Sequence, residues 1–290
     1  MRPRDLADLV LLAALWGASF LFMRYAAPAF GPLPLIWLRV GVAAACLLPL
    51  LLVRGPHGVL RQHAGSLTVM GVFSAALPFA LIAWATLSIT AGLASILNAT
   101  VPIFTALIGA LWLGEQLGRW RSVGLVVGFV GVLLLAGDQA DFKPGGSGWA
   151  IAAMLLATLS YGFAANFAKV RLAGVPVLVN ATGSQLVSTA VLLPFAIALR
   201  PQESPGPWPW AAAVALGVAC TALAFLLFFR LLANVGAART VTVTFLIPLF
   251  GVLWGAVFLG ETVNAGMLAS GGVVVLGTAM ATGVLPPRRR

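Results

Sequence analysis

The chain alternates between long apolar stretches and short breaks rich in proline, glycine and arginine. The stretches run for roughly 18–25 residues, the length that a helix needs to cross a lipid bilayer. Ten membrane-spanning helices are predicted, at about residues 6–27, 33–53, 66–88, 91–113, 121–137, 148–170, 175–199, 209–232, 237–259 and 265–285. The sequence lacks the alternation of apolar and polar positions that marks barrel strands, so the pattern predicts an all-α integral membrane protein.

The composition agrees with this class. Hydrophobic residues make up 61% of the 290 positions and charged residues 8%, too few to cover a water-soluble domain of this size. The first apolar run follows Arg2 and Arg4, as in a secretory signal peptide. We expect it to be a spanning helix instead, because it is long and because its equivalent near Tyr161 lies in the middle of the chain.

Basic residues predict the orientation. The net charge of +10 would suggest nucleic-acid binding in a soluble protein, but in a membrane protein lysine and arginine gather on the cytoplasmic side. With the N-terminus in the cytoplasm, thirteen of the 17 basic residues fall inside and only Arg24, Arg39, Lys143 and Arg200 fall in the outer half. Both termini are therefore predicted to be cytoplasmic. The expected surroundings are the lipid bilayer, and no nucleic-acid partner is expected.

One segment of the chain occurs twice. Residues 101–117 read VPIFTALIGALWLGEQL and residues 247–263 read IPLFGVLWGAVFLGETV, with eight of seventeen positions identical. The same offset of 146 residues relates Phe79 to Phe225. The chain is therefore predicted to contain two copies of one unit.

The repeat predicts the architecture. We expect a first repeat at residues 1–143 and a second at residues 144–290, each with five spans. Because five is odd, the second repeat enters the membrane in the opposite direction. Inverted repeats are typical of transporters that give alternating access to a site at the bilayer midplane.

Two prolines at equivalent positions point to such a site. Pro102 and Pro248 lie near the middle of the fourth and ninth spans, and each lacks the N–H that would bond the carbonyl four residues earlier. Those carbonyls belong to Asn98 and Thr244, which are themselves equivalent and polar. A single proline is often only a kink. The pair with polar neighbours favours a wet central cavity, because unpaired polar groups in hydrocarbon cost several kcal/mol.

Aromatic and polar residues near mid-span are further candidates for this cavity. Trp16 and Tyr161 are equivalent at an offset of 145 residues. Arg39 lies inside the second span, where it could hold a carboxylate or extend its charge to the outer surface. The remaining candidates for the cavity wall are Ser19, Phe20, Phe79, Asn166 and Phe225. Packing and ligand binding both remain possible roles for these side chains.

Residues for other chemistry are missing from the predicted spans. No Asp, Glu or His lies deep in a span, Cys46 and Cys220 have no zinc-type spacing, and no GxxxxGK[ST] loop is present. We therefore expect no cofactor, no metal and no enzymatic activity. Transport could be uncoupled or could use one of the peripheral acids.

These features resemble the ten-helix branch of the drug/metabolite transporter superfamily, the EamA type. The resemblance covers the whole chain and rests on Trp16-Gly17-x-x-Phe20, on Leu38-Arg39, and on Pro102…Leu113-Gly114-Glu115 with its duplicate Pro248…Leu259-Gly260-Glu261. It implies a basket of helices in which spans 1, 3, 4, 6, 8 and 9 line a cavity while spans 5 and 10 support it. It also implies a plasma-membrane exporter of amino acids or related metabolites, and the aromatic and neutral amino-acid exporters are the branch that we favour.

The sequence thus predicts a carrier for small metabolites, most of all neutral or aromatic amino acids, and it is compatible with a monomer. Multidrug or dye efflux is the alternative within transport, since an aromatic cavity without buried carboxylates would suit it. A membrane-embedded enzyme is the alternative of another class, and it would require a nucleophile–base pair or metal ligands at one depth.

Overall fold

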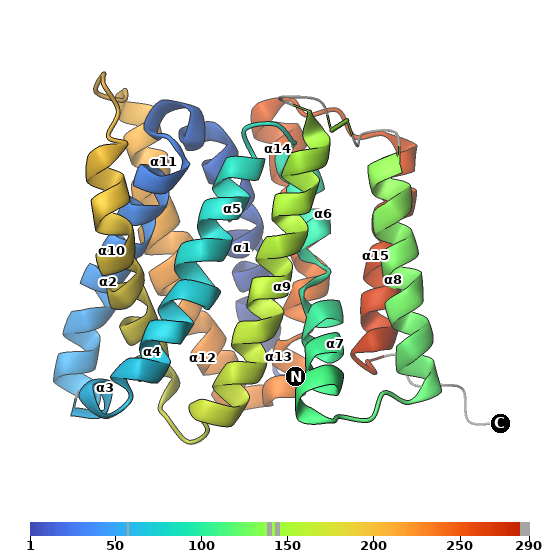
Figure 1. Ribbon diagram of the computed structural model, residues 1–290, viewed down its shortest axis with the longest axis horizontal. Helices are drawn as coiled ribbons and strands as arrows, with labels where there is room; N and C mark the ends of the chain where they lie inside the picture. Colours follow the sequence, from blue (N-terminus) through green and yellow to red (C-terminus); the bar gives the residue numbers. More distant parts are fainter. Residues whose placement is uncertain (57, 138–140, 143–145, 285–290) are drawn as a thin grey trace.

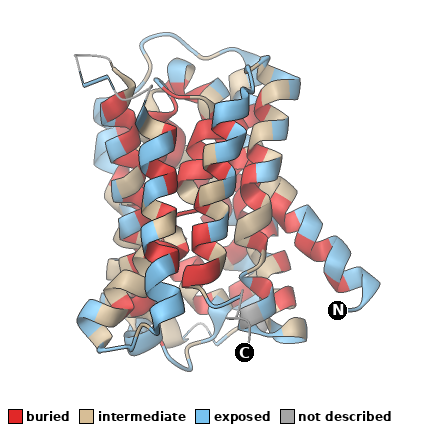
Figure 2. Ribbon diagram, turned by 90° about the vertical axis from the view of Figure 1, so that its right-hand side faces the viewer, coloured by how far each residue is buried: buried red, intermediate tan, exposed pale blue. Residues whose placement is uncertain are grey.

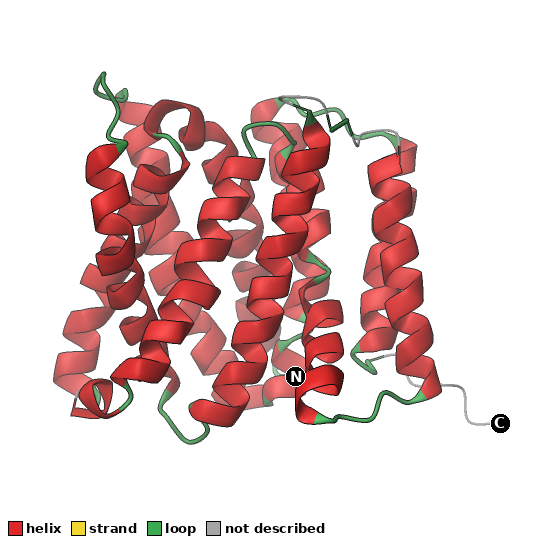
Figure 3. Cartoon of the chain, viewed as in Figure 1, coloured by secondary structure: helices red, strands yellow, loops and turns green. Residues whose placement is uncertain are grey.

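The computed structural model describes residues 1–56, 58–137, 141–142 and 146–284. Every regular element within these residues is a helix, and none is a strand (Figure 3). The predicted all-α class is therefore confirmed. Lys143 and the three C-terminal arginines, which entered the prediction of orientation, lie outside the described residues.

The helices follow the predicted spans, and several spans consist of more than one helical segment. In chain order the segments are α1 (Pro3–Phe30), α2 (Pro32–Arg54), α3 (Gly58–Gln62), α4 (Ala64–Gly71), η1 (Val72–Ala76), α5 (Leu77–Ala85), α6 (Ala91–Asn98), α7 (Val101–Leu113), α8 (Arg119–Gly137), α9 (Ser147–Arg171), α10 (Val177–Ala198), α11 (Pro207–Gly217), η2 (Val218–Leu223), α12 (Ala224–Val235), α13 (Ala237–Thr240), α14 (Val243–Leu259) and α15 (Ala265–Ala281). The segments η1 and η2 are π-helical turns.

Eight helical stretches in the described part of the chain are long and apolar enough to cross a membrane. The two shorter apolar helices, Val243–Leu259 and Ala265–Ala281, correspond to the last two predicted spans. The long helices stand side by side in one bundle (Figure 1). Buried positions gather between the helices (Figure 2). Large apolar residues such as Leu111, which is 79% exposed, lie at the surface, as expected where lipid covers it.

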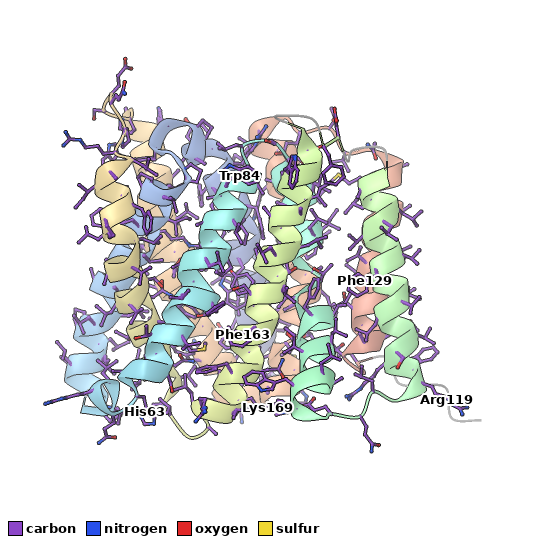
Figure 4. The ribbon with its side chains drawn as sticks, viewed as in Figure 1. His63, Trp84, Arg119, Phe129, Phe163 and Lys169 are labelled. Atoms are coloured by element: carbon purple, nitrogen blue, oxygen red, sulfur yellow. The ribbon has the colours of Figure 1, made fainter. Side chains whose placement is uncertain are left out.

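The two ends of the bundle are distinguished by the residues that lie at them. His63, Arg119 and Lys169 lie at the same end as the N-terminus, and Trp84 lies at the opposite end (Figure 4). We refer to these as the basic end and the Trp84 end.

Glycines allow the closest helix contacts. The pair α8 and α15 lies at the edge of the bundle (Figure 1). There a Cβ added to Gly277 would lie 2.2 Å from the backbone nitrogen of Gly128. In the interior, a Cβ on Gly17 would lie 2.7 Å from the Cβ of Phe250, and one on Gly162 would lie 2.8 Å from the carbonyl carbon of Phe104. Small residues let helix backbones approach in this way in membrane proteins.

The two prolines occupy different local structures, although the sequence makes them equivalent. Pro102 lies in the first turn of α7, after a break at residues 99–100. Proline is well tolerated there because the first turn has no use for its missing N–H. Pro248 lies inside α14. The fourth span is therefore interrupted at its midpoint rather than kinked.

The contact between α8 and α15 can be tested by substitution. Gly277→Ala should lower the free energy of unfolding by about 1–3 kcal/mol, because the added methyl group overlaps backbone atoms that have no room to move. The matched control is Gly272→Ala in the same helix, where a Cβ would have no heavy atom within 4 Å. Thermal unfolding in detergent measures both effects, and equal destabilisation by the two substitutions would contradict this account of the contact.

Candidate functional site

A cavity of about 380 Å³ lies inside the bundle. Its volume falls in the range of small-molecule sites. Among the described residues, it is lined by side chains from every predicted span except the fifth and the tenth. The predicted spans 2 and 7 thus contribute to the wall in addition to the six spans that the family resemblance implied. The lining residues are Trp16, Ser19, Phe20, Met23, Arg39, Met70, Ser74, Phe79, Ile82, Asn98, Val101, Tyr161, Val177, Asn180, Ala181, Ser184, Cys220, Thr221, Phe225, Phe228, Phe229, Thr244 and Ile247.

Nine of the twelve candidate residues named from the sequence lie together in this wall. They are Trp16, Ser19, Phe20, Arg39, Phe79, Asn98, Tyr161, Phe225 and Thr244. The other three, Pro102, Asn166 and Pro248, are buried outside the lining. The amide nitrogen of Asn166 donates to the carbonyls of Thr105 and Gly162, both at 2.9 Å, so Asn166 links α9 to α7.

Arg39 is the charged residue of the cavity wall. Its side chain is only 3% exposed. Nε donates to the hydroxyl of Thr221 at 3.0 Å, and the guanidinium carbon lies 3.7 Å from the ring centroid of Phe79. Nη1 contacts the sulfur of Met23 at 3.5 Å. Within the described part of the chain no carboxylate forms an ion pair with Arg39. The cation is therefore held in place but not neutralised.

The local sequence explains how Arg39 is held. A Cβ on Gly217 would lie 2.6 Å from Val42 and 3.0 Å from the carbonyl oxygen of Arg39, so only glycine lets α2 approach α11 this closely. The π-helical turn η2 follows directly. In this turn the hydroxyl of Thr221 donates to the carbonyl of Leu216 at 2.8 Å while it accepts from Arg39. Such turns often mark functional sites, and this one aims a hydroxyl at the guanidinium.

Aromatic rings form the other walls. Tyr161 packs against Phe79 with ring centroids 6.3 Å apart, so the ring under Arg39 is itself supported from α9. Nearer the basic end, Phe225 stacks on Phe229 with centroids 5.8 Å apart. These rings present apolar area to a ligand and lose little conformational freedom when one binds.

Among the described residues of the lining, two buried amide oxygens have no protein partner. They belong to Asn98 and Asn180. A buried acceptor without a partner is costly, so such atoms are expected to bond to water or a ligand. They offer hydrogen-bond acceptors in the same cavity as the guanidinium of Arg39.

The cavity opens at the basic end. At its opposite limit Met23 is 1% exposed and Ile82 is 2% exposed. At the basic end, where α10 begins close to Lys169, Val177 is 37% exposed (Figure 4). Arg39 thus lies near the closed limit of a cavity that is open on one side.

Several lining residues were not found from the sequence. Ser74 and Thr221 are single hydroxyl residues in apolar runs, where packing and binding look alike. Asn180 and Ser184 lie in the seventh predicted span, which supplied none of the predicted candidates. A signal was available, since Ser184 is the equivalent of Arg39 at an offset of 145 residues.

An all-helical bundle with many apolar spans around a small-molecule cavity defines the class of polytopic membrane proteins with an internal binding site. The comparison of sequences gives the family. The EamA-like transporter family matches residues 7–137 and 148–283. The chain belongs to this family, in the drug/metabolite transporter superfamily, and is a multi-pass transporter of the cell membrane.

Relatives with similar sequences match nearly the whole chain. A "Probable terminal-alkyne amino-acid exporter" of Streptantibioticus cattleyicolor is 27% identical, over 97% of this chain and 94% of its own. The "Uncharacterized inner membrane transporter YedA" of Escherichia coli K12 is 23% identical, over 97% of this chain and 93% of its own. A solved crystal structure has a TM-score of 0.70 at 22% identity, with all of both chains covered, and supports the fold.

Two asparagines in the bundle should respond differently to substitution. Asn166→Ala should lower the free energy of unfolding by about 1–2 kcal/mol, because it removes two hydrogen bonds between buried groups. Asn98→Ala should leave stability within about 0.5 kcal/mol, because its amide oxygen has no protein partner. Thermal unfolding of the ligand-free protein makes this comparison. A larger loss for Asn98→Ala than for Asn166→Ala would contradict the assignment of Asn98 to the cavity and Asn166 to packing.

Proposed function

We propose that this protein exports small zwitterionic metabolites, most of all neutral and aromatic amino acids, by alternating access to the central cavity. The observation that carries the proposal is the buried guanidinium of Arg39, which lies above an aromatic ring in the cavity wall and has no ion-pair partner among the described residues. A cation held in this way favours a ligand that brings a carboxylate. The printed function of the Streptantibioticus relative, amino-acid export, agrees with this substrate class.

The rest of the wall suits the other parts of an amino acid. The amide oxygens of Asn98 and Asn180 lack protein partners and would accept hydrogen bonds from the ammonium group. Thr244 lines the same cavity, and carbonyls at the interrupted fourth span would add acceptors. Trp16 and Phe228, with ring centroids 5.6 Å apart, would pack against the side chain of the substrate. A cavity with this lining selects zwitterions and tolerates apolar side chains of different size.

The architecture that we propose has ten spans in two inverted repeats, at residues 1–143 and 144–290. Equivalent contacts support it. Gly17 meets Phe250 and Gly162 meets Phe104, which are the same pair of positions in the two repeats.

A second pair of contacts follows the same rule. Gly71 packs on Val187 and Gly217 packs on Val42, each with a Cβ-to-Cβ distance of 2.6 Å for an added Cβ. We place the basic end, and with it both termini, in the cytoplasm, as the distribution of lysine and arginine favours. The structure then represents the carrier open to the cytoplasm.

The alternatives give different results in the same assays. Multidrug or dye efflux would use the aromatic walls, but the cation of Arg39 disfavours the lipophilic cations that such carriers often take. The names of the family and of the relatives point to transporters rather than enzymes. A single chain encloses the whole cavity, so we propose that a monomer is sufficient for transport.

Flux in liposomes tests the proposal directly. Purified protein should move labelled neutral or aromatic amino acids at a rate that saturates with concentration and stays far below channel rates. Protein-free liposomes are the control. Absence of protein-dependent flux for all twenty amino acids would contradict the substrate class, and transport of dyes alone would favour the multidrug alternative.

Substitutions of Arg39 test the role of the carboxylate. Arg39→Gln should raise the half-saturation concentration for an amino acid about tenfold to hundredfold, because a charge-assisted hydrogen bond contributes about 1.5–3 kcal/mol. Arg39→Lys should give a smaller loss, since lysine keeps the charge but cannot reproduce the planar contact with Phe79. The α-carboxamide of the same amino acid serves as the matched ligand. If Arg39→Gln weakens acid and carboxamide equally, Arg39 has a structural role only.

A further inference from the structure

Two charged residues hold the chain at the Trp84 end. The carboxylate of Glu261, just after α14, accepts the N–H groups of Ala91 and Gly92 at 2.7 and 3.1 Å. Arg24 donates to the carbonyl of Thr86, where α5 ends. Together these side chains form hydrogen bonds with the backbone at both ends of the short connection between α5 and α6. Ala91 is fully buried by this arrangement.

The equivalent charged residues at the basic end have different partners. Glu115 corresponds to Glu261 at an offset of 146 residues, and Lys169 corresponds to Arg24 at an offset of 145. Instead of binding backbone groups, Lys169 and Glu115 form an ion pair with each other. The backbone positions that they would bind lie in the last turn of α12 and at the start of α13. There the carbonyl of Leu232 accepts the N–H of Gly236 at 3.1 Å, and Ala237, the equivalent of Ala91, is exposed.

Both glutamates are nevertheless presented in the same way. Each follows a glycine with positive φ, 67° at Gly114 and 65° at Gly260. The N–H of Glu115 donates to Gly109 at 3.2 Å, and the N–H of Glu261 donates to Gly255 at 3.1 Å. The two carboxylates therefore follow the same backbone turn, and they differ in the groups that surround them.

The packing of neighbouring helices also differs between the two ends. At the Trp84 end, α6 packs against α14, and a Cβ on Gly251 would lie 2.3 Å from the Cβ of Ser95. In the part of the chain that the structure describes, the equivalent helices α13 and α7 do not pack together in this way. The Trp84 end is closed where the basic end is open.

We propose that the pair Lys169–Glu115 is the open form of a latch whose closed form is visible at the Trp84 end. This inference rests on the proposed alternating access. When the basic end closes, Glu115 exchanges Lys169 for the N–H groups of residues 237 and 238, and Lys169 binds the carbonyl of Leu232, the equivalent of Thr86. At the same time Glu261 and Arg24 release the connection between α5 and α6 and pair with each other.

The energies of the two forms make the latch directional. An ion pair between exposed side chains contributes little, whereas a carboxylate that accepts two backbone N–H groups contributes considerably more. Each glutamate therefore stabilises mainly the state in which its own end is closed. The same substitution at the two equivalent positions should shift the carrier in opposite directions.

Site-directed alkylation measures this shift. In a background with Cys46→Ser and Cys220→Ser, the reporter Ile82→Cys lies at the Trp84 limit of the cavity, and a membrane-impermeant maleimide reaches it from outside only when that end opens. Glu261→Gln should raise its labelling rate about fivefold and Glu115→Gln should lower it about fivefold, because each replaces a charged acceptor by a neutral one. The control reporter Trp84→Cys, at an exposed position, should label equally in all variants.

A second pair of substitutions tests the latch even if the two glutamate variants fail to fold. Arg24→Met should raise the labelling of Ile82→Cys and Lys169→Met should lower it. Shifts of the same sign at the two ends, or no shift in either pair, would overturn the latch. The readout requires no substrate, so opposite shifts without amino-acid flux would retain the latch and contradict only the proposed substrate.

Discussion

The structure depends on one constraint, that a guanidinium group buried in a membrane-spanning bundle must be solvated by something other than lipid. Arg39 is 3% exposed and has a hydroxyl, a thioether and an aromatic ring as neighbours. These groups orient the cation without neutralising it, and within the described residues it has no ion-pair partner. A charged side chain at this depth faces the bundle interior or a water-filled cavity, or it pairs with another polar group. The cavity and its opening at the basic end meet this requirement, and the proposed preference for a carboxylate follows from it.

The two halves of the chain share a sequence pattern but differ in the state of their ends. Equivalent glycines support equivalent helix contacts in the two proposed repeats. At the Trp84 end the carboxylate of Glu261 is bound to backbone N–H groups, while Glu115 at the basic end pairs with an exposed lysine. A perfectly symmetric arrangement would be closed or open at both ends. The difference between these two glutamates is what one stage of an alternating cycle requires.

Much of the fold and part of the candidate site could be predicted from the sequence, because a lipid bilayer constrains the length of apolar helices and the position of polar residues. Apolar length predicted the helices, and aromatic and polar residues within apolar runs predicted nine of the residues in the cavity wall. The interruption before Pro102 could not be predicted, since a proline in the first turn of a helix and one inside a helix look the same in sequence. The packing role of Asn166 and the site role of Thr221 depend on which neighbour each side chain meets, and the folded chain alone determines this. The π-helical turn that presents Thr221 has no signature in the sequence.

The central claim is that the two ends open in turn, and distances between spin labels at equivalent positions test it most directly. Gln116 and Asn234 are exposed at the basic end, and their equivalents Thr262 and Ser88 are exposed at the Trp84 end. Double electron–electron resonance on each labelled pair, in lipid with and without substrate, reports the opening of each end. The account predicts two populations whose changes are reciprocal, so that the Gln116–Asn234 distance shortens as the Thr262–Ser88 distance lengthens. Distances that stay fixed, or that lengthen together at both ends, would contradict it.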